Sequence, residues 1–488
     1  MYNYIYKPKT INSSHFKNNE FALSPFNYRK TVFKNNNTYT LENLLNNKIY
    51  KGFEPGTTSY IGFSDNYFIR ISDLDDLNLT FDITEDTKKI IPPSSDEDLI
   101  NKYDILYQSA SNEGNVCIYL GDKPAYYNSH LRKLLFNEDK FYIFALLKSN
   151  VGKQQVEVLG SIKGMDNFKE NYLLNTVIPY PNKKNHEFPN KVKFLVSQIT
   201  QNIINKEEQI KNKNLQIDEL IEAEIKSNQK ENLFSYEYPT INKIKYESRM
   251  DTVLYEKEYT SLEFLVLNYI NDVFFLKPEH VSPGKTPKDY YFTSKKQNNT
   301  YLWVTPKNMA RRQLLYNTYI YSSKPSNTKK HSLIFTGVRY VGNCFFVDNL
   351  SEPVYCNQNT LVINYSSNII DQLYLLCYLS SNIGRNMQLM QRIKGIVPIL
   401  YKADLVKIPI PNFPINIRTK LSRLYYNPVH KDNNIALEEY LAKEIDYNQQ
   451  LGIYQLNMEI LDLRNKLNEL IDKIANEKPI SIDINNFL

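Results

Sequence analysis

GNVCIYLGDKPAYYN at residues 114–128 and GNCFFVDNLSEPVYCN at residues 342–357 are two versions of one pattern in the same 488-residue chain. Each begins with Gly-Asn, continues through an apolar run typical of a strand, and ends with a tyrosine followed two positions later by an asparagine. An internal repeat has to be sought first, because missing one misassigns the whole fold. The question is how far the similarity extends on either side.

The similarity extends over most of the chain in a single order. The other matched pairs are PGTTSY from Pro55 with PGKTPKDYY from Pro283, YFIRIS from Tyr67 with TYLWVT from Thr300, FYIFALLKSNVGK from Phe141 with LYLLCYLSSNIGR from Leu373, IKG from Ile162 with IKG from Ile393, and IPYPN at 178–182 with IPIPN at 408–412. Each match is short, but their common order and nearly constant offset indicate a duplication. We therefore predict two related modules.

Each copy is followed by a long polar helical pattern. Across residues 192–220 apolar residues recur at helical spacing, although Lys206 and Lys213 interrupt the stripe. Across residues 456–474 they alternate in steps of four and three, which is typical of a coiled coil. Proline lacks an N–H and biases the preceding residue toward extended geometry, so each Ile-Pro string predicts the end of a strand and of a module.

These patterns predict a mixed α/β (α+β) fold. We expect two tandem modules related by pseudo-two-fold symmetry and separated by two long antiparallel coiled-coil helices. The expected boundaries are 1–188 for the first module, 189–232 for a central spacer helix, 233–415 for the second module, and 416–488 for a C-terminal spacer helix region. The stretch before the second helix is longer than its counterpart before the first.

Composition limits the class of protein. Hydrophobic residues make up 42% of the chain and aromatic residues 13%, which is enough to build folded cores. The formal charge of +6 permits a polyanionic partner without requiring one. The four cysteines have neither zinc-site spacing nor the density of a disulfide framework, and residues 1–14 lack the apolar stretch of a signal peptide. Residues 261–276 are too short and too polar for a membrane span. We expect a soluble protein of the reducing cytoplasm with no membrane contact.

The sequence lacks the motifs of several enzyme classes. It contains no phosphate-binding loop, dinucleotide fingerprint, zinc-hydrolase or deaminase motif, nucleophile elbow, or Asp/Asn-Pro-Pro-aromatic methyltransferase motif. The six histidines are scattered. The acidic clusters SDLDDL at 72–77 and SSDEDL at 94–99 suit solvated loops and helix N-termini, with a nuclease metal site as the alternative. We expect no catalytic residue, no metal and no cofactor.

One known family resembles this pattern over nearly the whole chain. The segments that carry the resemblance are PGKTP at 283–287, YLWVTPKNM at 301–309, IFTGVRYVGNCFFV from Ile334, PVYCNQN from Pro353, and IKGIVPILYKADLVKIPIP from Ile393. They look like the successive signatures of a target-recognition domain in the specificity subunits of type I restriction-modification systems. The first half carries looser versions of them. The second spacer departs from the family pattern by its extra length.

The resemblance implies a non-catalytic subunit that reads double-stranded DNA for a phage-defence complex. Its two target-recognition domains would read a bipartite site with a fixed gap. Its helices would set the spacing and bind two N6-adenine methyltransferase subunits, and restriction subunits that translocate DNA would join this core. Neither half indicates which bases it reads.

Candidate DNA-contacting residues fall into two groups, because phosphates attract cations, hydroxyls and amides, whereas base edges are read by Arg, Lys, Asn and Gln. Positions with suitable chemistry in both halves are Lys153 with Arg385, Lys163 with Lys394, Ser72 with Thr305, and Asn128 with Asn357. Positions that differ between the halves, where base readers are expected, are Arg70, Ser111, Asn112, Lys123, Lys285, Lys295, Lys296, Trp303, Lys307, Arg311, Arg339 and Gln358.

Two alternatives come from other classes. A stand-alone DNA endonuclease would use a degenerate acidic site and cleave DNA without partners. A coiled-coil scaffold with two protein-binding modules would not contact DNA. Salt-dependent DNA binding distinguishes the scaffold from a DNA reader, because each neutralised phosphate steepens the salt dependence.

Overall fold

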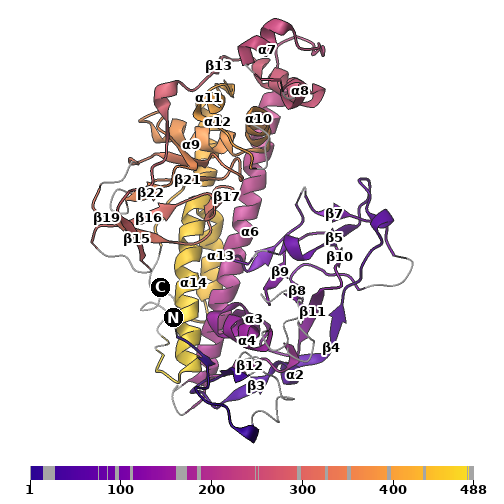
Figure 1. Ribbon diagram of the computed structural model, residues 1–488, viewed down its shortest axis with the longest axis vertical. Helices are drawn as coiled ribbons and strands as arrows, with labels where there is room; N and C mark the ends of the chain where they lie inside the picture. Colours follow the sequence, from indigo (N-terminus) through magenta and orange to yellow (C-terminus); the bar gives the residue numbers. More distant parts are fainter. Residues whose placement is uncertain are drawn as a thin grey trace. The chain divides into compact units, whose positions relative to one another are not determined.

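The protein is described by a computed structural model (Figure 1). The described residues are 2–14, 28–74, 76–84, 86–93, 98–109, 114–160, 173–183, 188–247, 249–250, 252–293, 298–324, 328–348, 353–392, 397–431, 436–480 and 482. The chain divides into two compact units. Unit 1 comprises Met1–Glu208, Lys431–Asp446 and Asp462–Leu488, and unit 2 comprises Gln209–His430 and Tyr447–Leu461.

The module in unit 1 is built on two sheets. Its strands are β4 (Leu45–Lys51), β5 (Tyr67–Ile69), β6 (Thr80–Phe81), β7 (Lys88–Lys89), β8 (Ile105–Gln108), β9 (Val116–Tyr119), β10 (Ala125–Tyr127) and β11 (Leu131–Phe136). The larger sheet has the order β4-β11-β8-β9-β6, and the smaller has the order β10-β5-β7. Strands β5 and β10 are parallel, with Phe68 opposite Tyr126. Buried Leu106 and Tyr127 belong to one apolar core that both sheets share.

The module in unit 2 also has two main sheets. Its strands are β14 (Val281–Pro283), β15 (Tyr290–Thr293), β16 (Thr300–Val304), β17 (Met309–Ala310), β18 (Gln313–Leu314), β19 (Tyr319–Ser322), β20 (Leu333–Thr336), β21 (Cys344–Phe346), β22 (Val354–Cys356) and β23 (Thr360–Ile363). The sheets have the orders β14-β23-β20-β21 and β15-β19-β16-β22, and β17 and β18 form a hairpin. Strands β16 and β22 are parallel, with Trp303 opposite Tyr355.

The strand orders confirm the predicted mixed α/β fold with two related modules. Order β4-β11-β8-β9 in unit 1 corresponds strand by strand to β14-β23-β20-β21 in unit 2. The parallel pair β5 and β10 corresponds to the parallel pair β16 and β22. The predicted symmetry axis between the modules stays a prediction.

The Ile-Pro strings end each module in the same way. Strand β12 (Val177–Pro179) pairs with β3 (Thr38–Thr40), and β24 (Ile410–Pro411) pairs with β13 (Val273–Phe274). The hydroxyl of Tyr142, in α3 (Lys140–Lys148), donates to the carbonyl oxygen of Pro179 at 2.6 Å. The hydroxyl of Tyr378, in α9 (Ile369–Leu379), donates to that of Pro409 at 2.8 Å. A buried tyrosine thus holds the first proline of each string.

The hydrogen bonds correct the predicted alignment of the two Pro-Gly segments. The N–H of Gly52 donates to Leu131, the first residue of β11, at 3.4 Å. The N–H of Gly284 donates to Thr360, the first residue of β23, at 2.9 Å. Gly52 is therefore the counterpart of Gly284, and the predicted match of Gly284 with Gly56 is wrong.

A second alignment is also shifted. The N–H of Asn128 donates to the last residue of β5 at 2.9 Å, and the N–H of Asn357 donates to the last residue of β16 at 3.3 Å. The residues that follow these strands, Arg70 and Thr305, are therefore counterparts. The predicted pairing of Ser72 with Thr305 is wrong by two positions.

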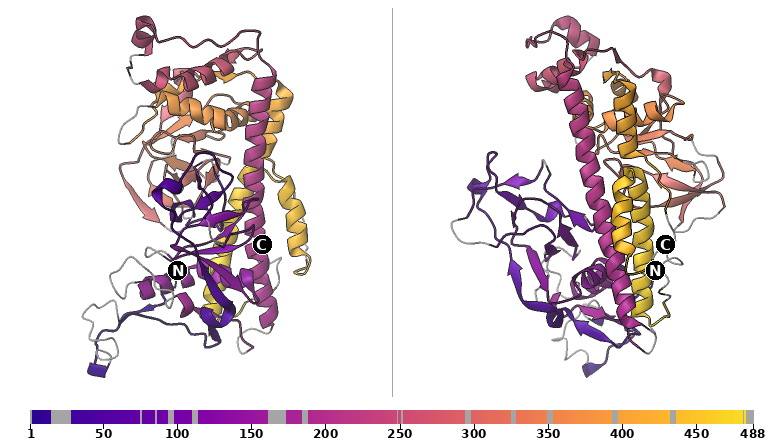
Figure 2. Two further views of the ribbon diagram at one scale, coloured as in Figure 1. Left: turned by 90° about the vertical axis from the view of Figure 1, so that its right-hand side faces the viewer. Right: turned by 180° about the vertical axis from the view of Figure 1, so that it is seen from behind.

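Helix α6 (Pro189–Ser227) is a single helix of 39 residues, and α14 (Ile453–Ala475) has 23 residues (Figures 1 and 2). Within unit 1 the two are antiparallel, as predicted. Asn182, which precedes α6, donates to Glu477, which follows α14, at 3.0 Å, whereas Glu207 accepts from Arg464 at 2.6 Å. The predicted apolar stripes are buried at Val192, Val196, Ile199, Ile203, Ile210 and Ile217 and at Leu456, Ile460, Leu463, Leu467, Leu470 and Ile474.

The long stretch before the second helix contains two further helices. Helix α12 (Ile415–Tyr425) packs on α9, where the Ser422 hydroxyl donates to the carbonyl oxygen of Ile370 at 3.0 Å. Helix α13 (Tyr440–Gln450) instead contacts α6. The boundary predicted at residue 416 stays a prediction, with α12 as a helix of unit 2 beyond it.

Shorter elements complete the two units. They are β1 (Ile5–Tyr6), β2 (Lys30–Thr31), α2 (Leu41–Leu44), α4 (Asn150–Gly160), α7 (Ile241–Glu247), α8 (Lys257–Leu267), α10 (Asn382–Gln391) and α11 (Lys402–Leu405). No helix of the described residues has the length and hydropathy required to cross a bilayer.

Candidate nucleic-acid interface

Each module brings three loops together at the carboxyl ends of its parallel strand pair. In unit 1, β5 is followed by Arg70 and β10 by Asn128, while the N–H of Phe53 donates to the last residue of β10 at 3.1 Å. In unit 2, Thr305 follows β16, and the N–H of Lys285 donates to the last residue of β22 at 3.0 Å. Ligands commonly bind outside the carboxyl ends of parallel strands, because loops from different strands meet there. We call these two regions the carboxyl-end edges.

The carboxyl-end edge of unit 1 carries both charges. The Arg70 guanidinium forms an ion pair with Asp73 at 3.0 Å and keeps a partly exposed side chain. The Asn128 amide donates to the carboxylate of Glu54 at 2.7 Å, and the Ser129 hydroxyl donates to the same oxygen at 3.0 Å. The exposed carboxylate of Glu54 therefore offsets part of the positive charge that Arg70 brings.

The carboxyl-end edge of unit 2 is more cationic. Lys285, Lys307 and Gln358 are exposed there. The Thr286 hydroxyl donates to the side-chain oxygen of Gln358, which orients that amide. The Thr305 hydroxyl and N–H both donate to Asn308, at 3.2 and 2.7 Å. Cations and an oriented amide are the groups that contact phosphates and base edges.

The asparagines shared by the two halves have a structural role. The side-chain oxygen of Asn128 accepts from the N–H of His130 at 2.9 Å, and that of Asn357 accepts from the N–H of Asn359 at 3.2 Å. Asparagine stabilises turns through such a bond to the backbone two residues on. Turn geometry alone therefore accounts for an asparagine at this position in both modules.

Two residues predicted to contact DNA, Arg311 and Trp303, instead contact other residues of unit 2. The Arg311 guanidinium forms an ion pair with Asp218 of α6 at 2.5 Å and donates to the carbonyl oxygen of Ser380 at 2.7 Å. Burial and the neighbouring Arg312 lower the pKa of Arg311 to about 10. Trp303 is only 8% exposed and packs against buried apolar residues. Both side chains are therefore engaged within unit 2, unlike those of Lys285, Lys307 and Gln358, which are exposed.

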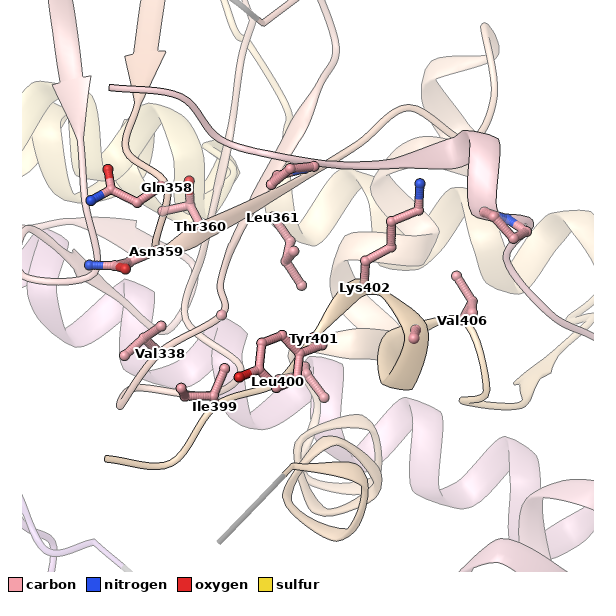
Figure 3. A pocket seen from close by; sticks show the side chains of 14 residues that line it. Val338, Gln358, Asn359, Thr360, Leu361, Ile399, Leu400, Tyr401, Lys402 and Val406 are labelled. Atoms are coloured by element: carbon pink, nitrogen blue, oxygen red, sulfur yellow. The ribbon is translucent and has the colours of Figure 1, made fainter. Parts of the chain in front are cut away.

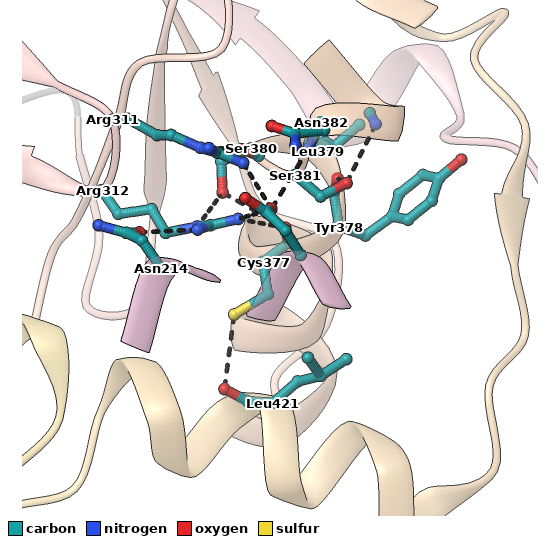
Figure 4. A network of polar contacts seen from close by, with 12 residues as sticks. Asn214, Arg311, Arg312, Cys377, Tyr378, Leu379, Ser380, Ser381, Asn382 and Leu421 are labelled. Atoms are coloured by element: carbon teal, nitrogen blue, oxygen red, sulfur yellow. Dashed lines mark hydrogen bonds and ion pairs between the residues drawn. The ribbon is translucent and has the colours of Figure 1, made fainter. Parts of the chain in front are cut away.

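Arg312, which the sequence analysis did not single out, is the centre of this network (Figure 4). Its side chain is fully buried and donates to the Ser380 hydroxyl and the Asn214 side-chain oxygen, each at 2.7 Å, and to Asp218 at 3.3 Å. A buried charge is stable only when it is paired and hydrogen-bonded. These bonds fix the β17–β18 hairpin of the module to helix α6.

Unit 1 has an equivalent connection between sheet and helix. The carboxylate of Glu207 in α6 accepts from the N–H groups of Leu79 and Thr80, at 3.1 and 2.9 Å, and pairs with Arg464 at 2.6 Å. In unit 2, Asn457 of α14 makes two bonds to the backbone of Leu314, at 2.8 and 2.9 Å. In the sequence, these contacts are signalled by polar residues, such as Glu207 and Asn457, that stand beside the apolar stripes of the two long helices.

Among the other predicted residues, Ser72 also lies at the unit 1 edge, where its hydroxyl donates to the carboxylate of Asp73 at 3.3 Å. Lys123 is exposed near Asp65, 3.9 Å away, and the aliphatic part of Arg385 covers Gly342. Ser72, Lys153 and Arg339 are exposed. Six predicted residues lie outside the described residues: Ser111, Asn112, Lys163, Lys295, Lys296 and Lys394.

A cavity of about 670 Å³ adjoins the unit 2 edge (Figure 3). Gln358 and Asn359 of the β22–β23 turn line it together with Leu361, Ile399 and Leu400, so most of its wall is apolar. Within the stretches that the structure describes, no three His, Cys, Asp or Glu residues gather as a metal site. Residues 94–97 of the second acidic cluster lie outside those stretches.

No protein-family model and no curated protein matches the chain. Solved structures do match. They include the type I restriction-modification S subunit from M. genitalium, at 14% identity over 91% of this chain and 98% of that one, with a TM-score of 0.39. A structure described as showing the assembly and conformational transition of the type I R-M system matches at 14% identity, 90% and 97% coverage and a TM-score of 0.28. The HsdS subunit from Thermoanaerobacter tengcongensis matches at 13% identity, 90% and 95% coverage and a TM-score of 0.25.

Proposed function

We propose that this chain is a non-catalytic DNA-recognition subunit of a type I restriction-modification complex, with each module reading one part of a bipartite target. The observation that supports this most is the duplicated module: the same strand order occurs in both units. Each copy is also fixed to the long helices by buried polar bonds. Two copies of one module, each bonded to a long helix within its own unit, suit a partner that repeats along its length, as DNA does.

The dimensions of α6 suit this role. Its 39 residues extend about 58 Å at about 1.5 Å per residue. One turn of DNA is about 34–36 Å long, so a helix of this length is sufficient to set a spacing greater than one turn. The gap between the two parts of the target stays unspecified, because it depends on how the modules approach DNA.

We propose that the carboxyl-end edges make the principal DNA contacts. The proposed residues there are Arg70, Asn128, Lys285, Thr305, Lys307, Asn357 and Gln358. The remaining candidates, which are exposed, half-buried or outside the described residues, are kept as further contacts: Ser72, Ser111, Asn112, Lys123, Lys153, Lys163, Lys295, Lys296, Arg339, Arg385 and Lys394. Trp303 and Arg311 are left out, because packing and ion pairing already engage their side chains.

We also propose that the helices bind two methyltransferase subunits and that restriction subunits join this core. Phe194 and Leu215 are exposed apolar residues on α6, and such positions favour a protein partner. Co-purification with an N6-adenine methyltransferase in a two-to-one ratio is the expected result. A Leu215→Lys variant should weaken that association, whereas Lys257→Glu on α8 should not.

The decisive experiment is a salt titration of DNA binding by the purified chain. A DNA reader that neutralises several phosphates loses affinity steeply as salt increases. Binding that is absent at low salt would instead support the protein scaffold. Cleavage of DNA by the purified chain with magnesium would support the stand-alone endonuclease and contradict a non-catalytic subunit.

A further inference from the structure

Strand β15 presents three consecutive aromatic rings to solvent. Tyr290, Tyr291 and Phe292 are 39%, 57% and 61% exposed. Within its sheet β15 is the edge strand, and β19 is its neighbour. A soluble chain seldom exposes large rings side by side without a partner.

The rings have fixed orientations. Alternation along the strand puts Tyr290 and Phe292 on one side, where their rings meet edge to face with centroids 5.6 Å apart. Tyr291 lies on the other side and stacks on Tyr321 at 4.9 Å, with an angle of 18° between the rings. A ring that is already oriented loses little conformational entropy when it contacts a ligand.

Tyr290 continues into an aromatic cluster beneath the surface. Its ring stacks on Trp303 at 6.0 Å, with an angle of 25° between the rings. Trp303 packs in turn with Ile320, Tyr355 and Tyr301. The exposed rings of β15 are thus the outer edge of a packed cluster, and Trp303 is the only tryptophan of the chain.

This strand distinguishes unit 2 from unit 1. Strand β7 is antiparallel to β5, as β19 is to β16, so β7 and β19 are counterparts. In the described part of unit 1 the position beyond β7 holds a single antiparallel bridge, between Tyr60 and Ile90, in place of a strand. Strand β15 therefore pairs over four residues at an edge where unit 1 pairs at one.

The charges around β15 indicate its partner. Lys285, Lys288 and Lys324 are exposed on the segments that flank β15 and β19, and Asp289 contributes one carboxylate. Aromatic rings beside an excess of cations are the combination that binds unstacked nucleobases and the phosphates next to them. A lipid or apolar protein partner would not require the lysines.

We propose that β15 stacks its exposed rings, Phe292 foremost, on nucleobases that have left the duplex stack, so that module 2 prefers DNA with unpaired bases. This rests on the proposed DNA-recognition function and goes beyond reading a paired site. Stacking on an aromatic ring is tolerant of base identity, since every base has a π face. The strand would therefore favour locally opened DNA whatever its sequence.

The test compares the full-length chain on two DNA probes: a paired duplex, and the same duplex with a short unpaired stretch at its centre. Trp303 fluorescence reports binding, because its ring lies under Tyr290. The wild-type chain should prefer the opened probe. Phe292→Leu should reduce that preference about tenfold, because the ring is lost while an apolar side chain remains. Phe292→Tyr should retain it.

The control is Tyr238→Ala, which removes another exposed ring of unit 2, 84% exposed and outside the sheets. It should leave the preference unchanged. Equal preference in the wild type and Phe292→Leu, with salt-dependent binding of both probes intact, would overturn this inference and leave the proposed function standing. If Phe292→Leu instead weakened binding of a protein partner and left the preference for the opened probe unchanged, the inference would also be overturned. No binding to either probe would overturn both.

Discussion

The amino nitrogen of Lys206 lies 3.5 Å from a carboxylate oxygen of Glu444, and the two side chains are 0% and 1% exposed. Asn202 donates to the same carboxylate at 2.8 Å and to the Tyr440 hydroxyl at 2.6 Å. Lys431 pairs with the other oxygen of Glu444 at 2.7 Å. A buried polar cluster therefore joins α6 to α13 within unit 1.

Removing one partner of this pair should destabilise unit 1. Glu444→Leu leaves the Lys206 ammonium buried without its carboxylate, which costs about 3–5 kcal/mol. The double variant Lys206→Met/Glu444→Leu should recover most of that loss, because neither charge remains buried. Urea unfolding measures both free energies.

The matched control for this pair lies at the start of α13. Lys443 pairs with Glu439 at 3.2 Å, but both side chains are exposed. Lys443→Met should change the free energy of unfolding by no more than about 0.5 kcal/mol. If the double variant Lys206→Met/Glu444→Leu were as unstable as Glu444→Leu, the unpaired charge of Lys206 would not be the cause of the lost stability.

This cluster also explains what the sequence left unresolved in the first helix. Lys206 and Lys213 interrupt a stripe that is otherwise apolar, and both contact α13: Lys206 through Glu444, and Lys213 through the carbonyl oxygen of Gln449 at 2.9 Å. The periodicity of one helix predicts which face is buried. It cannot predict a partner on a helix more than two hundred residues later in the chain.

The repeat was predictable, but its alignment was not. Matching Pro-Gly with Pro-Gly placed Gly56 opposite Gly284, whereas the hydrogen bonds make Gly52 the counterpart. The pairing of Ser72 with Thr305 was shifted by two positions. A shift of two keeps every side chain on the same face of a strand, so an alternating pattern cannot detect it.

The candidate site was predictable only as a set of residue types. A basic or amide side chain in the sequence is equally suited to DNA or to the protein interior, and Arg311 pairs with Asp218 of α6. The shared Asn128 and Asn357 are explained by the turn that each begins. The convergence of loops at the carboxyl-end edges follows from parallel pairing between distant strands, which no local pattern contains.

The two counterpart glycines should not tolerate a side chain. A Cβ atom at Gly52 would overlap the carbonyl oxygen of Tyr127, and one at Gly284 would overlap that of Asn357. Gly52→Ala and Gly284→Ala should each cost about 1–3 kcal/mol, because the backbone has to move. Gly62→Ala is the control, since no atom lies within 4 Å of its added Cβ. Thermal unfolding that ranks Gly62→Ala with the other two would contradict this.

Stability should fall at alkaline pH because of two buried thiols. Burial raises the pKa of Cys344 to about 11 and the pKa of Cys377 to about 12, from an ordinary value of 9.0. The folded state keeps both thiols protonated, whereas the unfolded chain ionises them. The contribution of these thiols to the free energy of unfolding is fully present below about pH 9. As the pH rises from there to the pKa of each thiol in the folded state, the free energy of unfolding falls by about 1.4 kcal/mol per pH unit for each thiol.

Urea unfolding under reducing conditions checks this alkaline loss. Cys344→Ala should show a smaller decrease in the free energy of unfolding between about pH 9 and about pH 10 than the unmodified chain, because one ionising thiol is gone. Equal decreases in the two proteins would exclude Cys344 as a source. Buried tyrosines with raised pKa values contribute in the same direction at higher pH, so the comparison is confined to this window.

Lys285 should contribute one phosphate contact at the unit 2 edge. Its N–H is held by the last residue of β22, so the side chain starts from a fixed backbone position, and it is exposed. Lys285→Gln should weaken binding to every duplex alike and reduce the slope of log affinity against log salt by about 0.9. Lys257→Gln, at an exposed lysine on α8, removes the same charge away from the edge and should leave the slope unchanged. If both variants lower the slope equally, the effect is that of net charge, and Lys285 makes no specific contact.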